Sequence, residues 1–358
     1  MAEQDKLSEL PGVGPATAEK LINAGYMTYK SIASENESEL ANTADIGDNT
    51  AVDIVRAARE EAEIGGFNSA MDISDKRQNI TKISTLVPDL DNMLEGGIES
   101  QSITEFYGGF GAGKSQVTHQ LCVNVQLPIE HGGAEGSAIF IDTEDSFRPE
   151  RITEMVKGLP EDVLADVIKK EDVNVTVDDI KNSNVYHEGK EDTTAPVYQL
   201  SQLFQDRIEV AQSSSASHQM LLVDEAIEIV NNLSDTEFPA KLFVVDSVIS
   251  HFRAEHVGRG ELAKRQQKLN RHIHDLKRLG DMHNMAIVIA NQVQSNPDSY
   301  FGDPTKPTGG NILGHNSTFR LYLRNSKNNN RVVKLVDAPN LPDAECVVKI
   351  KKSGVKPE

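Results

Sequence analysis

The stretch from Gly108 to Ser115 reads GGFGAGKS, and it decides the fold. A strand-like run, Ile103 to Tyr107, comes before it, and an amphipathic helical pattern, Ser115 to Asn124, follows. The spacing fits G-x-x-x-x-G-K-[ST], a loop between a strand and a helix that binds phosphate groups. Its glycines let backbone amides curl around an anion, and the N-terminus of the next helix favours negative charge. We therefore expect an α/β fold with a nucleotide site at this loop.

The residue types of the loop predict the bound nucleotide and its metal. Lys114 supplies a positive charge at the β- and γ-phosphate oxygens, and the Ser115 hydroxyl is a ligand for Mg²⁺. Asp246 ends the apolar strand LFVVD and is the expected second anchor of Mg²⁺, through water. ATP and Mg²⁺ are therefore the predicted cofactors. The nucleotide contacts predicted from the loop are Gly108, Gly109, Phe110, Gly111, Ala112, Gly113, Lys114, Ser115 and Gln116.

Hydrolysis of a phosphoanhydride needs a base that activates water. The segment AIFIDTEDSFRPER places Asp142, Glu144 and Asp145 directly after a strand. We favour Glu144, because it lies 30 residues after Lys114 on the adjacent crossover and follows the strand end by two residues. The alternative is that these carboxylates are surface acids of an acidic region.

Apolar runs alternate with helical patterns over residues 83–358. SITEFY, SAIFID, KLFVVD and MAIVIAN each end where polar or glycine-rich sequence begins. This pattern is typical of a mostly parallel sheet, flanked by helices, with ligand loops at the carboxyl ends of its strands. The acidic residues 158–216 interrupt the alternation, and we interpret them as a partly ordered insertion with little catalytic content.

Residues 1–63 read as short helices without a strand pattern. LSELPGVGPATAEKL resembles a helix, a tight Gly-x-Gly turn and a second helix, which predicts a small all-α helix-hairpin-helix domain. In that motif, backbone amides at a helix N-terminus face a DNA phosphate. The alternative is a helical bundle that contacts only protein. Residues 64–82 open with a glycine pair and are predicted to be a linker.

The formal net charge of −19 is distributed unevenly. Residues 131–239 hold 23 Asp or Glu against 8 Lys or Arg, whereas residues 241–278 hold 9 basic residues against 4 acidic ones. Residues 316–334 contain 5 basic residues and no acidic one. Two basic islands in an acidic chain predict a local surface for anions such as nucleic acid. The acidic remainder fits a protein adapted to a salty cytoplasm, where charge repulsion is screened.

The chain shows no sign of a membrane or secretory location. It contains no run of 18 apolar residues, and the N-terminus MAEQDKLSEL lacks the features of a signal peptide. Its two cysteines, Cys122 and Cys346, have no partner spacing for zinc or a redox pair. We expect a cytoplasmic protein.

Several segments together resemble the archaeal RadA recombinases of the RecA superfamily, most closely the salt-adapted members. They are SITEFYGGFGAGKSQVTHQLCVNVQLP, FIDTEDSFRPERI, HFRAEHVGRGELAKRQQKLNRH, NQVQSNPDSYFGDPTKPTGGNILGHNSTFRLYLR and VKLVDAPNLPDAE. The resemblance covers nearly the whole chain and thins within residues 158–216. It implies an ATP-dependent strand-exchange enzyme that forms a helical filament or ring on single-stranded DNA and pairs it with a duplex, with mediator proteins as possible partners.

The resemblance also implies roles for single residues around the nucleotide. Glu144 matches the catalytic glutamate, and Arg151 matches the arginine that stacks on the adenine. Gln292 matches the glutamine that senses the γ-phosphate, and His315 matches a second sensor that acts across a subunit interface. Asp337 and Pro342 bound the segment DAPNLP, which matches the cap that a neighbouring subunit lays over the nucleotide. The resemblance leaves open a monovalent cation such as K⁺ near Asp337.

Two loops, residues 253–260 and 296–310, match the DNA-binding loops of this family. Both lie in or beside the basic islands, and contacts of this kind would hold single-stranded DNA by its backbone. Phe67 and Ala70 match the Phe-x-x-Ala motif through which one subunit joins the next into a polymer. The implied DNA contacts are Arg253, Arg259, Gly309, Gly310 and Asn311.

Two other functions stay open at this point. The chain could be an ATPase of the RecA type that forms no filament, such as a ring motor. It could also be a recombinase paralogue that loads partners onto DNA without exchanging strands.

Overall fold

The computed structural model describes residues 7–62, 65–187, 190–256, 258–295 and 305–358. The chain divides into two compact units, residues 1–80 and residues 81–358. The larger unit begins two residues before the predicted start at residue 83. The smaller unit contains helices and, over its described residues, no strand, as the sequence predicts.

The first unit packs short helices around one apolar core. They are α2 (Pro15–Asn23), α3 (Tyr29–Ala33), α4 (Glu37–Thr43) and α5 (Asp48–Glu61). A further helix, α6 (Ala70–Arg77), follows them in the chain and contributes no buried residue. Gly12 has a φ of +88°, and Pro15 opens α2, as the Gly-x-Gly turn requires. Leu21, Ile32 and Ile54 are fully buried in the core.

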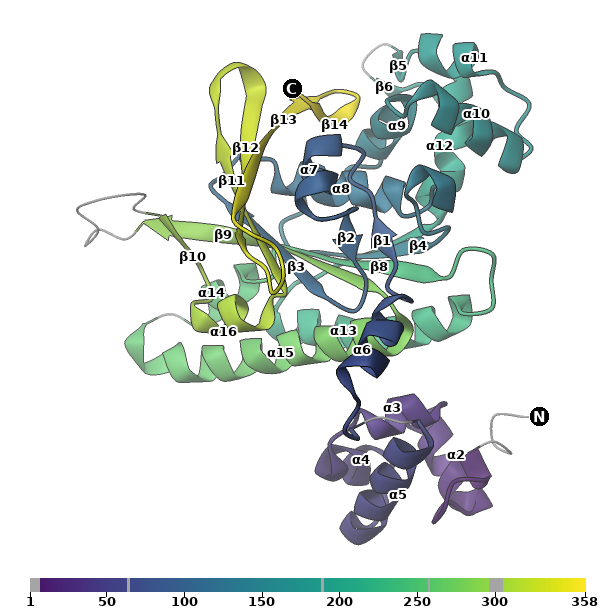
Figure 1. Ribbon diagram of the computed structural model, residues 1–358, viewed down its shortest axis with the longest axis vertical. Coiled ribbons are helices and arrows are strands. Elements are labelled where there is room, and N and C mark those ends of the chain that lie inside the picture. The colour runs from purple at the N-terminus through teal and green to yellow at the C-terminus, as the bar shows by residue number, and fades with distance from the viewer. Residues whose placement is uncertain (1–6, 63–64, 188–189, 257, 296–304) are drawn as a thin grey trace. The chain divides into compact units, whose positions relative to one another are not determined.

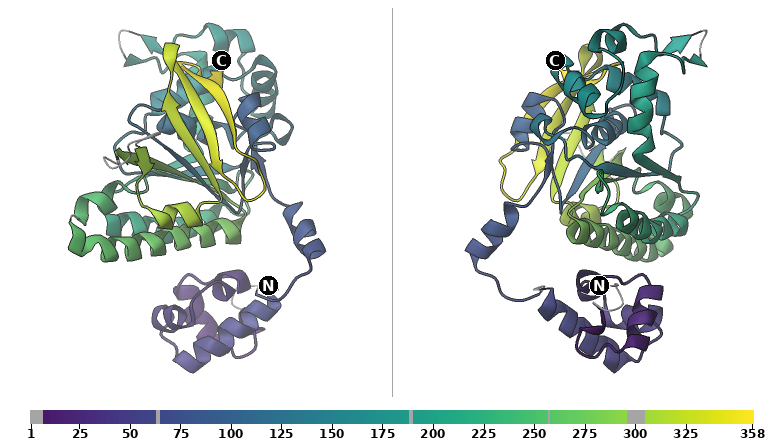
Figure 2. Two further views of the ribbon diagram at one scale, coloured as in Figure 1. Left: turned by 60° about the vertical axis from the view of Figure 1, so that its left-hand side comes forward. Right: turned by 90° about the vertical axis from the view of Figure 1, so that its right-hand side faces the viewer.

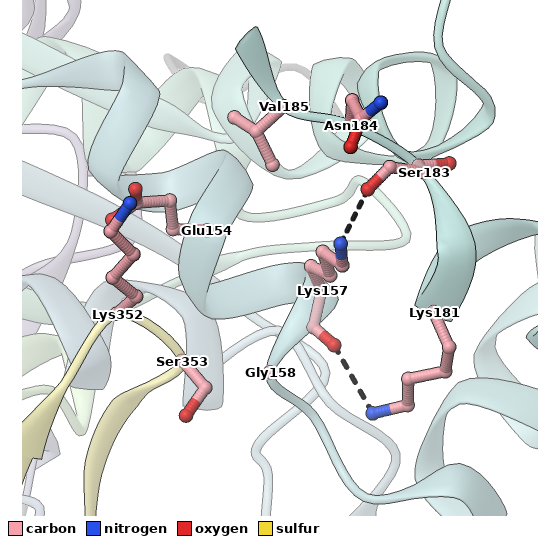
Figure 3. A pocket seen from close by; sticks show the side chains of 9 residues that line it. All are labelled: Glu154, Lys157, Gly158, Lys181, Ser183, Asn184, Val185, Lys352 and Ser353. Carbon is pink, nitrogen blue, oxygen red and sulfur yellow. Dashed lines mark hydrogen bonds between the residues drawn. The ribbon is translucent and has the colours of Figure 1, made fainter.

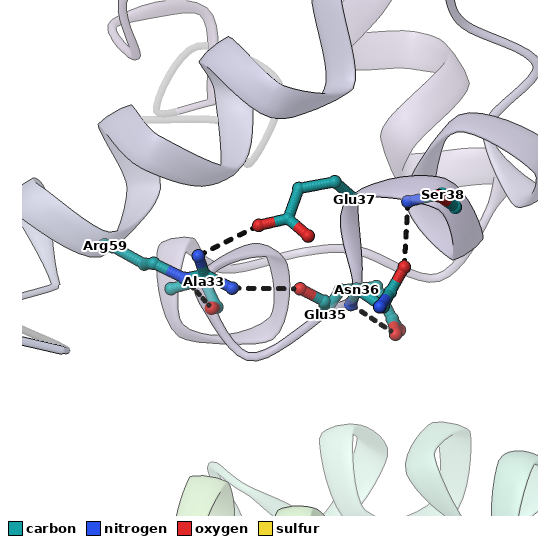
Figure 4. A network of polar contacts seen from close by, with 6 residues as sticks. All are labelled: Ala33, Glu35, Asn36, Glu37, Ser38 and Arg59. Atoms are coloured by element: carbon teal, nitrogen blue, oxygen red, sulfur yellow. Dashed lines mark hydrogen bonds and ion pairs between the residues drawn. The ribbon is translucent and has the colours of Figure 1, made fainter. Parts of the chain in front are cut away.

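Arg59 on α5 forms polar contacts with residues at the end of α3 and the start of α4 (Figure 4). Its Nη1 lies 3.0 Å from Oε1 of Glu37, and its Nε donates to the carbonyl oxygen of Ala33 at 3.0 Å. One guanidinium therefore satisfies both a carboxylate and a free carbonyl at a helix end.

The predicted linker contains a helix. Ser69 and Asp72 form a capping box, in which the Ser69 side chain accepts from the Asp72 backbone and Asp72 accepts from the Ser69 backbone. This local signal starts α6 although the segment has no apolar periodicity, and none of the helix is buried. The segment is thus partly helical rather than irregular throughout.

A central ten-stranded sheet organises the second unit (Figure 1). The strand order is β14-β13-β12-β11-β3-β9-β8-β4-β7, with β10 paired to β9. The pairs from β11 to β7 are parallel, and β11 to β14 form an antiparallel extension. The strands are β3 (Ile103–Gly108), β4 (Ser137–Asp142), β7 (Ile208–Gln212), β8 (Ala240–Asp246), β9 (Ala286–Ser295), β10 (Thr305–Pro307), β11 (Phe319–Asn325), β12 (Asn330–Asp337), β13 (Ala344–Lys351) and β14 (Gly354–Pro357). The predicted α/β fold with a mostly parallel sheet is confirmed.

Helices cover both faces of this sheet (Figures 1 and 2). Successive residues of β4 point to opposite faces, because Phe140 packs in one core cluster whereas Ile139 and Ile141 pack in the other. One face carries α7 (Pro88–Met93), α8 (Lys114–Asn124), α9 (Pro149–Lys157) and α12 (Pro196–Asp206). The other carries α13 (Ala216–Leu233), α14 (Ser250–Glu255), α15 (Leu262–His283) and α16 (Asn311–Asn316).

The interpretation of residues 158–216 as an insertion is wrong for the last part of that segment. β7 pairs in parallel with β4 as an edge strand of the central sheet, and Leu200 and Phe204 of α12 are fully buried. The alternation of helix and strand therefore continues through α12 and β7. Between α9 and α12 lie α10 (Glu161–Lys170), α11 (Val177–Asn182) and a small hairpin of β5 (Tyr186–His187) and β6 (Lys190–Glu191).

Short elements complete the second unit. β1 (Lys82–Ile83) and β2 (Ile98–Glu99) form a two-stranded sheet, and three single turns are η1 (Ile129–His131), η2 (Arg259–Glu261) and η3 (Lys327–Asn329). Over the described parts of the chain, no helix combines the length and the apolar character needed to cross a bilayer.

Candidate nucleotide and DNA site

The phosphate loop joins β3 to α8 and needs its glycines. Gly111 and Gly113 have φ values of +70° and +103°, which favour glycine. A Cβ added to Gly108 would lie 2.2 Å from the carbonyl oxygen of Leu323 on the neighbouring strand. The loop can therefore hold this shape only with glycine at these positions. It leaves Phe110 fully exposed.

A cavity of about 530 Å³ lies above the loop at the carboxyl ends of the central strands. This volume is typical of sites for small molecules and cofactors. Its walls bring together Lys114 and Ser115 from α8, Glu144 from the loop after β4, Asp246 from the end of β8, and Gln292 from β9. Lys114 and Ser115 were predicted from the phosphate-loop motif, Glu144 and Asp246 from two strand ends, and Gln292 from the family resemblance; the structure places all five around one cavity.

Lys114 faces this cavity beside two carboxylates. Its Nζ donates to the carbonyl oxygens of Gly108 at 3.0 Å and Gly109 at 3.1 Å. Burial lowers the pKa of Lys114, while the charges of Asp246 and Glu144 oppose that shift. The ammonium is already positioned within the loop that would surround the phosphates.

Ser115 and Asp246 fit a site for Mg²⁺. Burial raises the pKa of Asp246 to about 6, and a hydrogen bond from Ser115 opposes the rise. Thr118 Oγ1 also donates to Asp246 Oδ2 at 3.3 Å. Within the described ranges no group of three or more His, Cys, Asp or Glu side chains could hold a metal by itself. A hydroxyl and one carboxylate match Mg²⁺, which takes its other ligands from phosphates and water.

Glu144 is joined to the DNA-loop region by a chain of polar contacts. Gln292 Nε2 donates to Glu144 Oε1 at 2.5 Å, and Arg253 Nη1 donates to Gln292 Oε1 at 3.3 Å. The buried Asp142 shapes the loop under Glu144, because its carboxylate accepts from the backbone N–H groups of Glu144 at 3.1 Å and Phe147 at 2.9 Å. The candidate base thus has a fixed support on one side and a polar link on the other.

Arg151 lies at the side of the cavity, at the start of α9. Its Nε donates to Gln116 Oε1 at 2.7 Å, and its Nη1 lies 2.6 Å from Glu154 Oε2. Its Nη2 donates to the backbone carbonyl of Lys351 at 2.6 Å. The guanidinium is therefore held by several acceptors next to the phosphate loop, and its stacking on the adenine stays a prediction.

Five of the predicted nucleotide residues do not line this cavity: Ala112, which is buried in the phosphate loop, Arg151 beside it, and three residues farther along the chain. His315 on α16, Asp337 at the end of β12 and Pro342 beyond it are all exposed. Exposure is what residues need if they act on the nucleotide of a neighbouring subunit. Their roles stay predictions.

The predicted DNA contacts gather at one end of the sheet. Arg253 is exposed on α14, and Asn311 is exposed at the start of α16. Gly309 and Gly310 have φ values of +88° and +61°. Arg259 lies in η2, but its side chain is outside the described residues, as are residues 296–304 of the second loop.

Four residues of the cavity were missed in the sequence: Ser146, Val293, Arg331 and Ile350. Arg331 on β12 donates from Nε to the carbonyl oxygen of Gly111 at 3.3 Å, and Ile350 on β13 lies against Gly113. Both come from the antiparallel extension of the sheet, more than 200 positions after the loop they contact. Arg331 belongs to the second basic island, which is the only sequence signal that pointed to it.

Phe67 and Ala70, the predicted polymerisation residues, belong to the first unit. Phe67 is fully exposed, and Ala70 is the first residue of α6. A fully exposed phenylalanine is an apolar side chain that a second molecule can bury.

Comparison with known proteins agrees with this geometry. The family model described as Rad51 matches residues 76–177 and 185–358. The chain belongs to the Rad51 family. A second model, a SAM-like helix-hairpin-helix tandem, matches residues 5–60 and confirms the predicted type of the N-terminal domain.

The curated relatives of this Rad51 family member are similar along their whole length. A DNA repair and recombination protein RadA from Haloquadratum walsbyi is 53% identical over 355 residues, which cover 99% of each chain. The protein of the same name from Halobacterium salinarum is 54% identical over 358 residues and 100% of both chains. That from Methanoculleus marisnigri is 50% identical over 357 residues and 100% of both chains. The predicted resemblance to RadA proteins, including those of salt-adapted archaea, is confirmed.

Proposed function

We propose that this chain is an ATP-dependent recombinase that forms filaments on single-stranded DNA and exchanges strands with a homologous duplex in recombination and break repair. The observation that carries the proposal is the contact chain from Glu144 through Gln292 to Arg253. It joins the residue placed to activate water at the nucleotide to an exposed arginine in a basic island. Nucleotide state and DNA binding can therefore influence each other through one side chain.

The residues of the loop bind and orient the triphosphate. Backbone amides of residues 109–115 and the helix N-terminus of α8 would contact its phosphates, with Lys114 at the β- and γ-oxygens. Ser115 and Asp246 would hold Mg²⁺. The bound ion supplies positive charge that offsets the charge developing on the transferred phosphoryl group.

Glu144 acts as the base for the attacking water. Its carboxylate is exposed to the cavity and held by Gln292, so it can accept a proton from water as the γ-phosphate is attacked. Loss of the γ-phosphate then changes what Gln292 contacts. Because Arg253 bonds to the same amide, its position and its contact with DNA phosphate would change too.

The residues that would join one subunit to the next lie on different parts of the chain, and this arrangement supports a filament. Phe67 would enter an apolar pocket on the next molecule, and His315, Asp337 and Pro342 would reach the nucleotide of a neighbour. A surface on one side of the molecule that binds a different surface of the next one gives an open helical polymer or a closed ring. Sequence specificity then resides in base pairing, since the DNA contacts proposed here are to the backbone.

A strand-exchange assay tests this function. Full-length protein should pair a circular single strand with a homologous linear duplex when ATP and Mg²⁺ are present. Lys114→Ala should abolish the reaction, whereas Lys169→Ala, which removes an exposed lysine on α10, should leave it intact. Single-stranded DNA binding without any strand exchange by the native protein would favour the loader function instead. Full exchange by Lys114→Ala would refute the assigned nucleotide site.

A further inference from the structure

A second cavity, of about 650 Å³, lies away from the phosphate loop and is lined by lysines (Figure 3). Its walls come from the end of α9, the end of α11 and the turn between β13 and β14. Lys157, Lys181 and Lys352 line it together with Glu154, Gly158, Ser183, Asn184, Val185 and Ser353. The volume is within the range of sites for small ligands.

The lysines of this cavity contact backbone carbonyls. Lys181 Nζ donates to the carbonyl oxygens of Lys157 at 3.1 Å and Leu159 at 2.5 Å. Lys157 Nζ donates to the carbonyl oxygen of Ser183. Lys356, which is not part of the cavity wall, donates from Nζ to the carbonyl oxygen of the wall residue Gly158 at 2.7 Å. These contacts fix the ammonium groups in place but leave their charges without a bonded carboxylate among the residues that the structure describes.

Positive charge therefore accumulates here, in the most acidic part of an acidic chain. Glu154, the one acid in the cavity wall, is already paired with Arg151 at 2.6 Å. Burial and the positive charges of Lys181 and Lys351 lower the pKa of Lys356 to about 8. Burial also lowers the pKa of Lys181, with Lys157 adding to the shift and Glu161 opposing it. A bound anion would relieve this repulsion.

The backbone around the cavity is closely packed. A Cβ added to Gly158 would lie 2.1 Å from the carbonyl oxygen of Ser353, so the end of α9 and the β13–β14 turn are in direct contact. Ser183 is buried and its hydroxyl donates to the carbonyl oxygen of Asp179 at 2.6 Å. The lysines of the cavity are thus attached to closely packed backbone.

One wall of the cavity belongs to a stretch that the family model does not match. The Rad51 model leaves residues 178–184 unmatched, and Lys181, Ser183 and Asn184 come from that stretch. None of the residues that line this cavity lines the nucleotide cavity, although Glu154 in its wall pairs with Arg151 beside that cavity.

We propose that this lysine-lined cavity binds an oligophosphate group, either free in solution or carried by a nucleic-acid backbone. Three lysines around a cavity of this size supply point charges and N–H donors to several phosphate oxygens at once. The proposal is independent of strand exchange, because it concerns only binding at residues outside the nucleotide site.

Calorimetric titration of the full chain with sodium tripolyphosphate tests this site. Saturating Mg²⁺–ADP is present throughout, so that the phosphate loop is blocked. We expect one saturable site whose affinity falls at least about tenfold in Lys352→Gln, the loss of one charge-assisted contact. Lys352 is exposed and its side chain has no hydrogen bond within the described structure, so the variant should fold. Lys157→Gln should weaken binding as well, and Lys169→Gln, outside the cavity, should not.

A second titration, with a short oligothymidylate, separates the two sources of phosphate. A larger effect of Lys352→Gln on tripolyphosphate than on the oligonucleotide supports a free anion, and the reverse supports a nucleic-acid backbone. The proposal is overturned if neither probe depends on Lys352 or Lys157. It is also overturned if tripolyphosphate binds only without ADP and this binding is lost in Lys114→Ala, because the phosphate loop would then be the only site.

Discussion

Glu105 offers the sharpest test of how the sheet supports the site. Its side chain is fully buried on β3 and forms an ion pair with Arg320 on β11, with Nε and Oε2 2.7 Å apart. It also accepts a hydrogen bond from Asn291 Nδ2 on β9 at 2.6 Å. Asn291 in turn contacts Thr308, at the base of the second DNA loop. One carboxylate therefore joins three adjacent strands beneath the nucleotide and DNA sites.

Glu105→Gln removes this charge with little change in shape. Arg320, only 14% exposed, would lose its counter-ion and partly face an amide donor. Leaving one charge of a buried pair without its partner costs about 3–5 kcal/mol. The melting temperature should then fall by on the order of 10 °C.

Circular dichroism at fixed salt and protein concentration measures the effect. The matched control is Glu345→Gln, because Glu345 lies 3.9 Å from Arg324 and both side chains are about half exposed. A surface pair of this kind contributes up to about 1 kcal/mol, so the control should barely shift the melting temperature. Equal destabilisation by the two variants, or a loss below about 1 kcal/mol for Glu105→Gln, would refute this reasoning.

Four further outcomes are expected. Lys114→Ala should lose ATP binding in a fluorescent-nucleotide assay, since the loop loses its cation; unchanged affinity would contradict the assigned site. Glu144→Gln should keep nucleotide affinity but lower the phosphate-release rate by about 10²–10⁴, the usual contribution of a general base. Phe67→Ala should shift the protein to monomers in light scattering, because its fully exposed ring would no longer enter a neighbour. Burial lowers the pKa of His272 to about 4, so the imidazole binds a proton more tightly in the unfolded chain than in the folded one. The contribution of this group to the free energy of unfolding is therefore fully present above pH 6.5 and is lost as the pH falls towards 4. Between pH 7 and pH 5 the free energy of unfolding of the wild type should therefore fall by roughly 2 kcal/mol more than that of His272→Gln, as measured by urea titration. The comparison with the wild type is needed because burial raises the pKa of Asp275 to about 6, which acts in the opposite direction.

The sequence predicted those parts of the fold that local chemistry specifies. The phosphate loop could be placed because its glycines, Lys114 and Ser115 act within eight consecutive residues. Asp246 could be placed because it ends an apolar strand, and parallel strands bring such ends to one edge. Gln292, which lies within β9, was placed by the family resemblance.

What the sequence did not predict depends on contacts between distant segments. Arg331 and Ile350 reach the cavity only because β12 and β13 extend the sheet beside the phosphate loop. The edge strand β7 has five residues, of which three are exposed and one is buried, so its apolar signal is weak. The helix α6 depends on a capping box of two side chains and has no buried face to give a periodic pattern.

In the proposed function, the bound nucleotide controls the affinity of the protein for DNA through Gln292. This control is tested most directly by the anisotropy of a labelled oligothymidylate, titrated with protein in the presence of a non-hydrolysable ATP analogue or of ADP. The wild type should bind at least about tenfold more tightly with the analogue, a difference of about 1.4 kcal/mol. Gln292→Ala should reduce this difference to near zero. Equal affinity of the wild type with both nucleotides would contradict the account.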